Sequence, residues 1–239
     1  MEGWSGLAPQ TYGLDRMSFK LWLALVFAVS FSVAGIARAE PLRIVAFGDS
    51  LMAGYQLDAG QSFPERLETA LRAAGHDVVI TNASVSGDTS SGGLARLDWS
   101  VPDGTDLVII ELGANDMLRG IAPELTEKNL EAMIERLRQR DIGIMLAGMM
   151  AAPNLGRDYA DRFNRIYPNL AERYGLPLYA FFLDGVAAQQ PLLLADGMHP
   201  NAEGVELIVQ RFLPVIGPVI GPGFGKGLGE MGLAPAGDR

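Results

Sequence analysis

The sequence predicts an α/β protein, a three-layer α/β/α sandwich built on a five-stranded parallel sheet. Five short apolar runs with β-branched residues have the pattern of strands that are buried on both faces. Segments with helical spacing lie between these runs, and the alternation favours a doubly wound sheet. Five strands are too few to close an eight-stranded barrel. The predicted strands are residues 42–47, 78–81, 107–112, 142–147 and 178–181.

Helical segments separate and follow the predicted strands. The first begins with Pro64 and is followed by Gly75, an order that is typical of helix ends. In the second, apolar residues recur at helical spacing, and Gly175 follows the third. The predicted helices are residues 64–74, 126–140, 157–174 and about 201–213.

Composition limits the classes of function that fit this chain. Its 239 residues include 19 Lys and Arg against 28 Asp and Glu, a formal net charge of −9. A surface of this sign repels phosphate backbones and argues against nucleic-acid binding. The absence of cysteine rules out thiol catalysis and cysteine-ligated zinc. We expect a monomer that acts on a small molecule and binds no metal.

Three segments are expected along the chain. Residues 1–39 are interpreted as an upstream segment with a signal peptide, and residues 40–216 as a single folded domain. Residues 217–239 are rich in Gly and Pro and are expected to be disordered.

The amino terminus has the pattern of a secretory signal peptide. A short basic lead at 17–20 precedes an almost unbroken apolar run at 21–36 and a small-x-small site at 37–39. We expect Met17 to be the true start, cleavage to follow Ala39, and the protein to be periplasmic or secreted. The alternative, an uncleaved anchor, fits less well because a spanning helix needs about 20 residues. No stable membrane span is expected after processing.

Three candidate functional residues follow directly from the first three predicted strands. Ser50 lies in a Gly-Asp-Ser turn, Gly87 in Ser-Gly-Asp, and Asn115 in Gly-Ala-Asn-Asp. In an open parallel sheet the site lies beyond the carboxyl ends of the strands, so we expect these residues to meet there. Taken singly, each motif also has the composition of an ordinary turn.

His199 is the candidate general base for Ser50. The chain has two histidines, and His76 lies in a predicted helix-to-strand turn. Asp196 lies three residues before His199, so its carboxylate can accept a hydrogen bond from Nδ1 and leave Nε2 free to take the Ser50 proton. The alternative is a loop with a helix cap and a surface histidine.

The remaining candidates are hydrogen-bond donors for a developing oxyanion. The backbone N–H groups of Ser50 and Gly87 and the side-chain amide of Asn115 are groups of the kind that stabilise a tetrahedral intermediate. With the predicted nucleophile and base, they complete the set that acyl transfer requires. The neighbouring acidic residues are expected to make turn and cap hydrogen bonds: Asp49, Asp88 and Asp116.

The four motifs, in this order, resemble the SGNH (GDSL-type) hydrolase superfamily, named for Ser, Gly, Asn and His. The resemblance extends over roughly 41–213, and residues 90–97 and 165–168 are similar to the bacterial thioesterase I, lysophospholipase and arylesterase branch. It implies a flavodoxin-like fold, no cofactor and a periplasmic location. It also implies a triad and an oxyanion hole, formed by Ser50, His199 and Asp196 and by Ser50, Gly87 and Asn115.

The resemblance further implies a serine hydrolase that cleaves carboxylic esters and thioesters through an acyl-enzyme on Ser50. We expect the acyl group to lie against two apolar loops, at 117–121 and 149–155, and Arg119 is a candidate contact for an anionic head group. Two small alanines in the second loop leave the acyl-chain preference open. The expected substrate-binding residues are Met117, Leu118, Ile121, Met150, Pro153 and Leu155.

Two other functions remain open from the sequence. The same residues are compatible with removal of O-acetyl groups from carbohydrates. A non-enzymatic binding module with a degraded site is the second alternative, and the presence of all five predicted site residues disfavours it.

Overall fold

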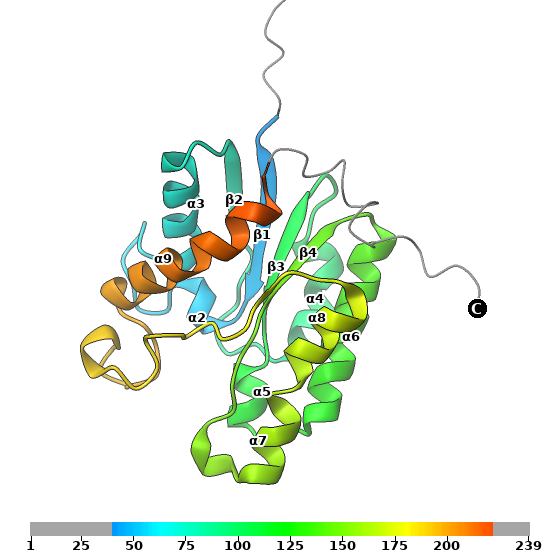
Figure 1. Cartoon of the computed structure of the whole chain (residues 1–239), viewed down its shortest axis with the longest axis vertical. Coiled ribbons are helices and arrows are strands. Elements are labelled where there is room, and N and C mark those ends of the chain that lie inside the picture. Colours follow the sequence, from blue (N-terminus) through cyan, green and yellow to red (C-terminus); the bar gives the residue numbers. More distant parts are fainter. Residues whose placement is uncertain (1–39, 222–239) are drawn as a thin grey trace, which may run out of the picture. The chain divides into compact units, whose positions relative to one another are not determined.

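The computed structural model describes residues 40–221 and contains a five-stranded sheet in which all strands are parallel. The strands are β1 (Leu42–Gly48), β2 (Val78–Asn82), β3 (Leu107–Glu111), β4 (Gly143–Ala147) and β5 (Leu178–Tyr179). Their order across the sheet is β2-β1-β3-β4-β5 (Figure 1). Strands β3 and β4 are buried along their whole length, as expected for a sheet that is covered on both faces. The predicted five-stranded parallel sheet is confirmed.

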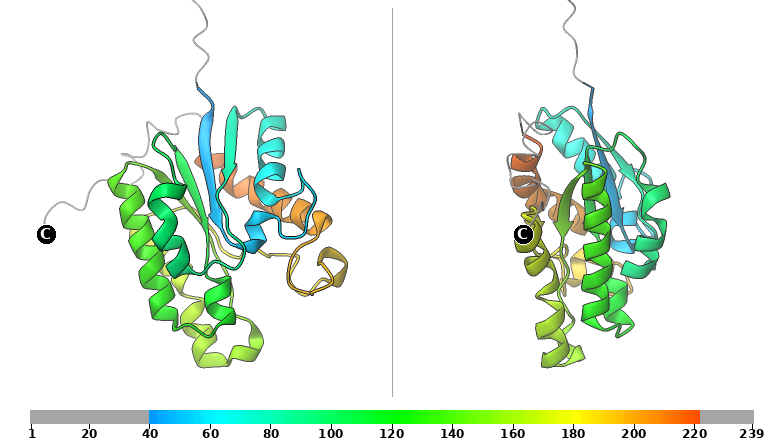
Figure 2. Two further views of the ribbon diagram at one scale, coloured as in Figure 1. Left: turned by 180° about the vertical axis from the view of Figure 1, so that it is seen from behind. Right: turned by 90° about the vertical axis from the view of Figure 1, so that its right-hand side faces the viewer.

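Helices cover both faces of this sheet. The helices are α2 (Ser50–Ala53), α3 (Phe63–Ala73), α4 (Ser90–Ser100), α5 (Ala114–Leu118), α6 (Pro123–Gln139), α7 (Arg157–Phe163), α8 (Ile166–Tyr174) and α9 (Ala202–Val219), with the short 3-10 helices η1 (Pro153–Leu155) and η2 (Gln190–Leu192). Helix α3 connects β1 to β2. Helix α4 lies in the connection from β2 to β3 and α6 in that from β3 to β4, and both of these connections run in the opposite direction along the sheet. Right-handed crossovers therefore place α3 on one face and α4 and α6 on the other. Helix α9 packs against α3, and α4 packs against α6 (Figure 2).

The strand order creates a switch point between β1 and β3. The chain leaves β1 toward β2 on one side and leaves β3 toward β4 on the other. Ligands of open α/β sheets bind beyond the carboxyl ends of the strands at such a point. In register, Gly48 at the end of β1 pairs with Glu111 at the end of β3. The segments that begin with Ser50 and Asn115 therefore start side by side.

The predicted helix at 157–174 is in fact two helices, α7 and α8. Pro168 explains the break, because in a continuous helix its ring would clash with the carbonyl of Asn164 and it could not donate to that carbonyl. Instead α7 ends at Phe163, and Pro168 falls in the first turn of α8, where no N–H partner is needed.

The last helix is longer than predicted. Helix α9 continues beyond 213 to Val219 with Pro214 and Pro218 inside it, so the predicted tail at 217–239 begins too early. The buried apolar stripe of this helix extends past the first proline to Ile216, and burial of that stripe offsets the lost backbone hydrogen bonds. The rest of the predicted tail from 222 onward, and the predicted signal peptide, lie outside the described residues. Within residues 40–221, no helix combines the length and hydropathy that a bilayer span requires.

Helix α4 was not predicted, because Gly92 and Gly93 obscure its periodicity. Thr89 caps the helix by accepting from the N–H of Gly92 at 3.2 Å. A Cβ at position 93 would collide with the side chain of Leu112, so the glycine allows α4 to pack closely on the sheet. Gly93 therefore weakens the helical pattern in the sequence and at the same time allows the close packing of α4.

Candidate active site

Ser50, His199 and Asp196 form one hydrogen-bonded chain. Ser50 Oγ lies 2.9 Å from His199 Nε2, and His199 Nδ1 lies 2.6 Å from Asp196 Oδ2. Ser50 begins α2 directly after β1, whereas the other two residues lie in the loop before α9. Side chains remote in sequence thus meet in the order nucleophile, base and orienting carboxylate that an activated serine requires.

Backbone hydrogen bonds hold the loop from Asp196 to His199. Asp196 Oδ1 accepts from the N–H groups of His199 at 3.0 Å and Met198 at 2.9 Å. These donors, that of His199 first, lower the pKa of Asp196 to about 2. Gly197 provides the left-handed residue of the turn, with φ at 69°. Asp196 is therefore ionised at neutral pH and holds the Nδ1 proton of the histidine.

A tight turn at the end of β1 presents Ser50. Asp49 is completely buried and caps α2 by accepting from the N–H of Leu51 at 3.0 Å. Gly48 permits the close approach of β3, because a Cβ at this position would lie 2.7 Å from Glu111 Oε2. A side chain at position 48 would displace either Glu111 or the turn that carries the serine.

Three hydrogen-bond donors belong to residues that line one cavity with His199. Ser50, Gly87 and Asn115 line the same cavity as His199. Across residues 40–221, the backbone N–H groups of Ser50 and Gly87 have no protein acceptor. Asn115 Nδ2 donates one proton to Asp49 Oδ2 at 2.9 Å, which leaves its second proton for another acceptor. The arrangement can therefore offer three N–H groups to a negatively charged oxygen.

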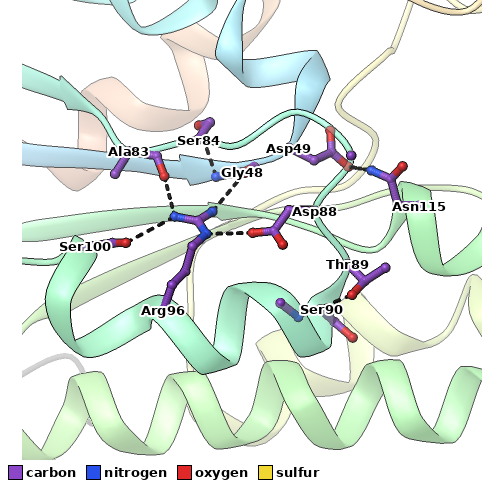
Figure 3. A network of polar contacts seen from close by, with 12 residues as sticks. Gly48, Asp49, Ala83, Ser84, Asp88, Thr89, Ser90, Arg96, Ser100 and Asn115 are labelled. Atoms are coloured by element: carbon purple, nitrogen blue, oxygen red, sulfur yellow. Dashed lines mark hydrogen bonds and ion pairs between the residues drawn. The ribbon is translucent and has the colours of Figure 1, made fainter.

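Arg96 on α4 ties the ends of β1 and β2 together (Figure 3). Its buried guanidinium donates to the carbonyl oxygens of Gly48 and Ala83 and to Asp88 Oδ2, the last at 2.6 Å. Asp88 was expected to make turn hydrogen bonds, but it is the ion-pair partner of this arginine. Because Asp88 directly follows Gly87, Arg96 holds the Gly87 loop against the turn that carries the serine.

Comparison with known protein families agrees with this geometry. The pattern of the GDSL-like lipase/acylhydrolase family matches residues 46–207, a range that includes all five predicted site residues. The chain belongs to the GDSL-like lipase/acylhydrolase family.

Individual members of this family are similar over most of their length. An arylesterase of Vibrio mimicus is 39% identical over 189 residues, which cover 79% of this chain and 94% of the relative. The Escherichia coli enzyme named thioesterase 1/protease 1/lysophospholipase L1 is 35% identical over 191 residues, 80% of this chain and 89% of the relative. The crystal structure of AlinE4, an SGNH-hydrolase family esterase, matches with a TM-score of 0.65 at 46% identity, covering 78% of this chain and 100% of that one. This chain is therefore a serine esterase of the family.

The cavity of this family member has a volume of about 600 Å³ and a mainly apolar lining. One part of the wall comes from α5 and the loop after β4, and another part from residues 183–193 and the His199 loop. The apolar residues of the lining are Leu51, Tyr55, Ala114, Met117, Leu118, Met149, Ala152, Leu183, Ala187, Ala188, Leu193 and Met198.

The predicted acyl-binding residues lie only partly in this cavity. Met117 and Leu118 line it, whereas the other four do not. After Gly120 the first loop turns away, and the Ile121 carbonyl accepts from the Tyr159 hydroxyl at 2.8 Å. In the second loop, Met149 and Ala152 line the cavity, whereas no residue of η1 does. The residues outside the cavity lining are Ile121, Met150, Pro153 and Leu155.

Sequence reasoning missed the wall at 183–193 and the aromatic residue beside the base. The wall is an irregular segment without hydrophobic periodicity, so no pattern marked it. The ring of Tyr55 lies 4.5 Å from the His199 ring, centroid to centroid, at an interplanar angle of 39°. Arg119, a candidate for head-group contact, donates to the Gly87 carbonyl oxygen at 2.9 Å. No group of three or more His, Asp or Glu side chains suited to a metal ion occurs within residues 40–221.

Proposed function

We propose that this enzyme hydrolyses carboxylic esters and thioesters through a covalent acyl-enzyme on Ser50. Ester hydrolysis follows from membership of the family. Arylesterase and thioesterase are names of relatives that align over most of this chain. The observation that carries the proposed roles is the continuous chain of hydrogen bonds from Ser50 Oγ through His199 to Asp196.

In the first half-reaction, His199 Nε2 takes the proton of Ser50 Oγ as the oxygen attacks the acyl carbon. The carbonyl oxygen becomes an oxyanion and accepts hydrogen bonds from Ser50 N–H, Gly87 N–H and Asn115 Nδ2. When the tetrahedral intermediate collapses, the bond to the leaving oxygen or sulfur breaks, and His199 gives its proton to that atom. The acyl group remains on Ser50.

In the second half-reaction, water replaces the leaving group. His199 removes a proton from the water, whose oxygen attacks the acyl carbon, and the proton then passes to Ser50 Oγ as the acyl bond breaks. The products are a carboxylic acid and the regenerated serine. Asp196 remains ionised in both steps and stabilises the imidazolium that each step creates.

An apolar acyl chain suits the cavity. Each methylene buried there contributes about 0.8 kcal/mol before the entropy of ordering the chain is counted. A carbohydrate O-acetyl esterase would need polar groups around the sugar, and the lining is mainly apolar. We therefore favour acyl esters over acetylated carbohydrates, and Met117 and Leu118 over the other predicted residues as acyl contacts.

Hydrolysis profiles distinguish these substrates. We expect p-nitrophenyl octanoate to give a higher kcat/KM than p-nitrophenyl acetate, and an acetylated glycan to be hydrolysed slowly if at all. Preference for the glycan would favour the carbohydrate esterase instead.

Covalent labelling tests the role of Ser50. A fluorophosphonate should label the wild-type enzyme at Ser50, and Ser50→Ala should abolish both labelling and hydrolysis. A wild-type protein that neither reacts with the probe nor cleaves any ester would support a non-catalytic binding module.

We infer that the enzyme is exported as a monomer. The basic lead, apolar run and small-x-small site in residues 17–39 support removal of this segment after Ala39, and the core then starts at residue 40. Intact mass of the protein recovered from the periplasm or medium should correspond to a start at Glu40. A retained leader in a membrane fraction would contradict cleavage.

A further inference from the structure

The carboxylate of Asp49 contacts both the serine turn and Asn115. It is completely buried, and its Oδ1 accepts from the N–H of Leu51 at 3.0 Å. Its Oδ2 accepts from Asn115 Nδ2 at 2.9 Å (Figure 3). An ionised carboxylate accepts at both oxygens and offers no donor. Asp49 therefore requires that Asn115 turn its nitrogen, and not its oxygen, toward it.

The negative charge of two neighbouring carboxyls resides on Asp49. Glu111 is fully buried, and burial raises its pKa well above the usual value, with the Asp49 charge acting in the same direction. Burial also raises the pKa of Asp49, to about 6, against the hydrogen bonds from Leu51 and Asn115. Burial therefore favours the protonated form of Glu111, whereas Asp49 is ionised at neutral pH.

Other charged or titratable groups also face Asp49. Asp88 opposes its ionisation and His199 favours it, both through space. The Arg96 guanidinium donates a hydrogen bond to the carbonyl oxygen of Gly48, the residue before Asp49. The Asp49 charge also contributes to raising the pKa of the Tyr167 phenol. The groups around Asp49 are Asp88 after β2, Arg96 on α4, Glu111 on β3, Tyr167 on α8 and His199 before α9.

We propose that Asp49 is a positioning residue for Asn115: its carboxylate takes one Nδ2 proton and thereby presents the other to the oxyanion. The proposal rests on the proposed function, in which Asn115 is an oxyanion donor. A side-chain amide is nearly symmetric in shape, so packing alone distinguishes its nitrogen from its oxygen poorly. A neighbour that can only accept removes this ambiguity before the substrate binds.

Substitution of Asp49 by Asn replaces the acceptor that faces Asn115 with a donor, and the shape of the side chain changes little. Asn is also a good helix cap, so its oxygen can keep the bond to Leu51 N–H. Its amide nitrogen then faces Asn115, which must turn its oxygen inward to accept. Asn115 loses the orientation that directs its second proton to the oxyanion.

A double-mutant cycle tests the proposal. Asp49→Asn and Asn115→Ala should each lower kcat for p-nitrophenyl octanoate by about 10²-fold, the loss typical of one oxyanion donor, with KM changed less than about threefold. The double variant should be no slower than Asn115→Ala alone, because Asp49 acts through Asn115. An unaltered kcat in Asp49→Asn, or losses that multiply in the double variant, would overturn the proposal.

Asp116→Asn is the matched control for loss of a buried carboxylate. Asp116 accepts from Ser90 and Thr126 and makes no hydrogen bond to the Asn115 side chain. Any loss of kcat in this variant should multiply with that of Asn115→Ala. If Asp116→Asn instead shows the same non-additivity, the effect is not specific to Asp49 and the proposal fails.

The pH dependence of a rate ratio provides a second readout. Because both enzymes contain His199, its titration cancels in the ratio of wild-type kcat to Asn115→Ala kcat. The ratio should be constant above about pH 7 and fall below about pH 6, where Asp49 takes up a proton and becomes a donor. A ratio that is flat down to about pH 5 would contradict the proposal.

The experiment separates this proposal from the function on which it rests. If wild-type enzyme fails to react with a fluorophosphonate, the proposed function is wrong. If wild-type labels and hydrolyses normally while Asp49→Asn matches it, only the role of Asp49 is wrong. Circular dichroism and the labelling stoichiometry measure the fraction of Asp49→Asn that is folded. The kcat of this variant is calculated per folded enzyme molecule.

Discussion

The two sides of the active site are held in place by different means. On the base side, Asp196 and His199 lie in a partly exposed loop, and hydrogen bonds between close neighbours in sequence hold them. On the oxyanion side, the segments after β1, β2 and β3 are joined by nearly buried side chains with ionisable groups: Asp49, Arg96, Glu111 and Asp116. The base side should therefore tolerate substitution without unfolding, whereas the oxyanion side should link activity to stability.

The largest effect on activity is expected from His199→Ala. Loss of the base should lower kcat/KM by about 10⁵-fold or more. Because the imidazole lies at the rim of the cavity, the melting temperature should change by less than about 3 °C. Ester hydrolysis and thermal denaturation measure the two quantities. His76→Ala is the control and should retain full activity; comparable losses in both variants would refute the assignment.

The largest effect on stability is expected from Arg96→Ala. The substitution leaves Asp88 without its ion-pair partner and the Ala83 carbonyl without a donor, whereas the Gly48 carbonyl keeps the N–H of Val85. Removal of one member of a buried pair costs about 3–5 kcal/mol, which corresponds to roughly 10 °C in melting temperature. Calorimetry should show this shift together with a loss of kcat.

The matched control for Arg96 is Arg136→Ala. Arg136 pairs with Asp98 at 3.3 Å, but both side chains are exposed. An exposed ion pair contributes about 0–1 kcal/mol, so this variant should melt within about 3 °C of wild type. Equal shifts in the two variants would remove the contrast between the buried network and the surface.

The charge state of Glu111 predicts how stability depends on pH. Burial raises the folded-state pKa of Glu111, so between the unfolded and folded pKa values the folded state binds one more proton. Stability should therefore fall as pH rises through this range, by about 1.4 kcal/mol per pH unit from this group. Glu111→Gln does not titrate and should lack this slope.

Urea denaturation between about pH 6.5 and 7.5 measures the difference, because Asp49 is largely ionised there in the folded state. The free energy of unfolding of Glu111→Gln relative to wild type should rise across this range. Parallel curves for the two proteins would show that Glu111 is ionised in the folded enzyme.

The smallest effect is expected from Ala188→Gly in the cavity wall on the base side. Ala188 has φ at 62°, a left-handed conformation that costs a residue with a Cβ about 1 kcal/mol or more. Glycine should stabilise the enzyme by about 1 kcal/mol in urea denaturation and change kcat little. Ala187→Gly, in the same wall but outside the left-handed region, should be neutral or destabilising. Stabilisation by both would assign the gain to another cause.

The sequence patterns were enough to predict the strands and the main site residues. They did not predict most of the contacts that join these parts. Ser50, Gly87 and Asn115 follow strand ends, and chain order together with the parallel sheet was enough to bring them to one edge. His199 was predicted to be the base for two reasons. The chain has only one other histidine, which lies in a predicted turn, and an aspartate lies three residues before His199. These inferences depend on local spacing and on one rule of topology.

The rest depends on contacts between residues distant in sequence. Glu111 lies in a run that was classed as an apolar strand, and nothing local shows that it pairs with Gly48 and faces Asp49. Arg96 lies in a segment whose glycines hid the helix. The break before Pro168, by contrast, follows from local sterics. The prediction of the acyl-binding residues was partly wrong. Part of the cavity wall is an irregular segment, and only the tertiary fold brings that segment near Ser50.

The lack of a side chain at Gly48 constrains how this enzyme can be altered. The space that a Cβ would need is occupied by the carboxyl group of Glu111 on the neighbouring strand. Directed evolution that randomises the serine turn alone will therefore recover only glycine at position 48. Variation of position 111 in the same library does not lift this restriction, because a Cβ at position 48 would also lie 2.8 Å from the backbone carbonyl oxygen of Glu111 and 2.9 Å from the Cβ of Met52.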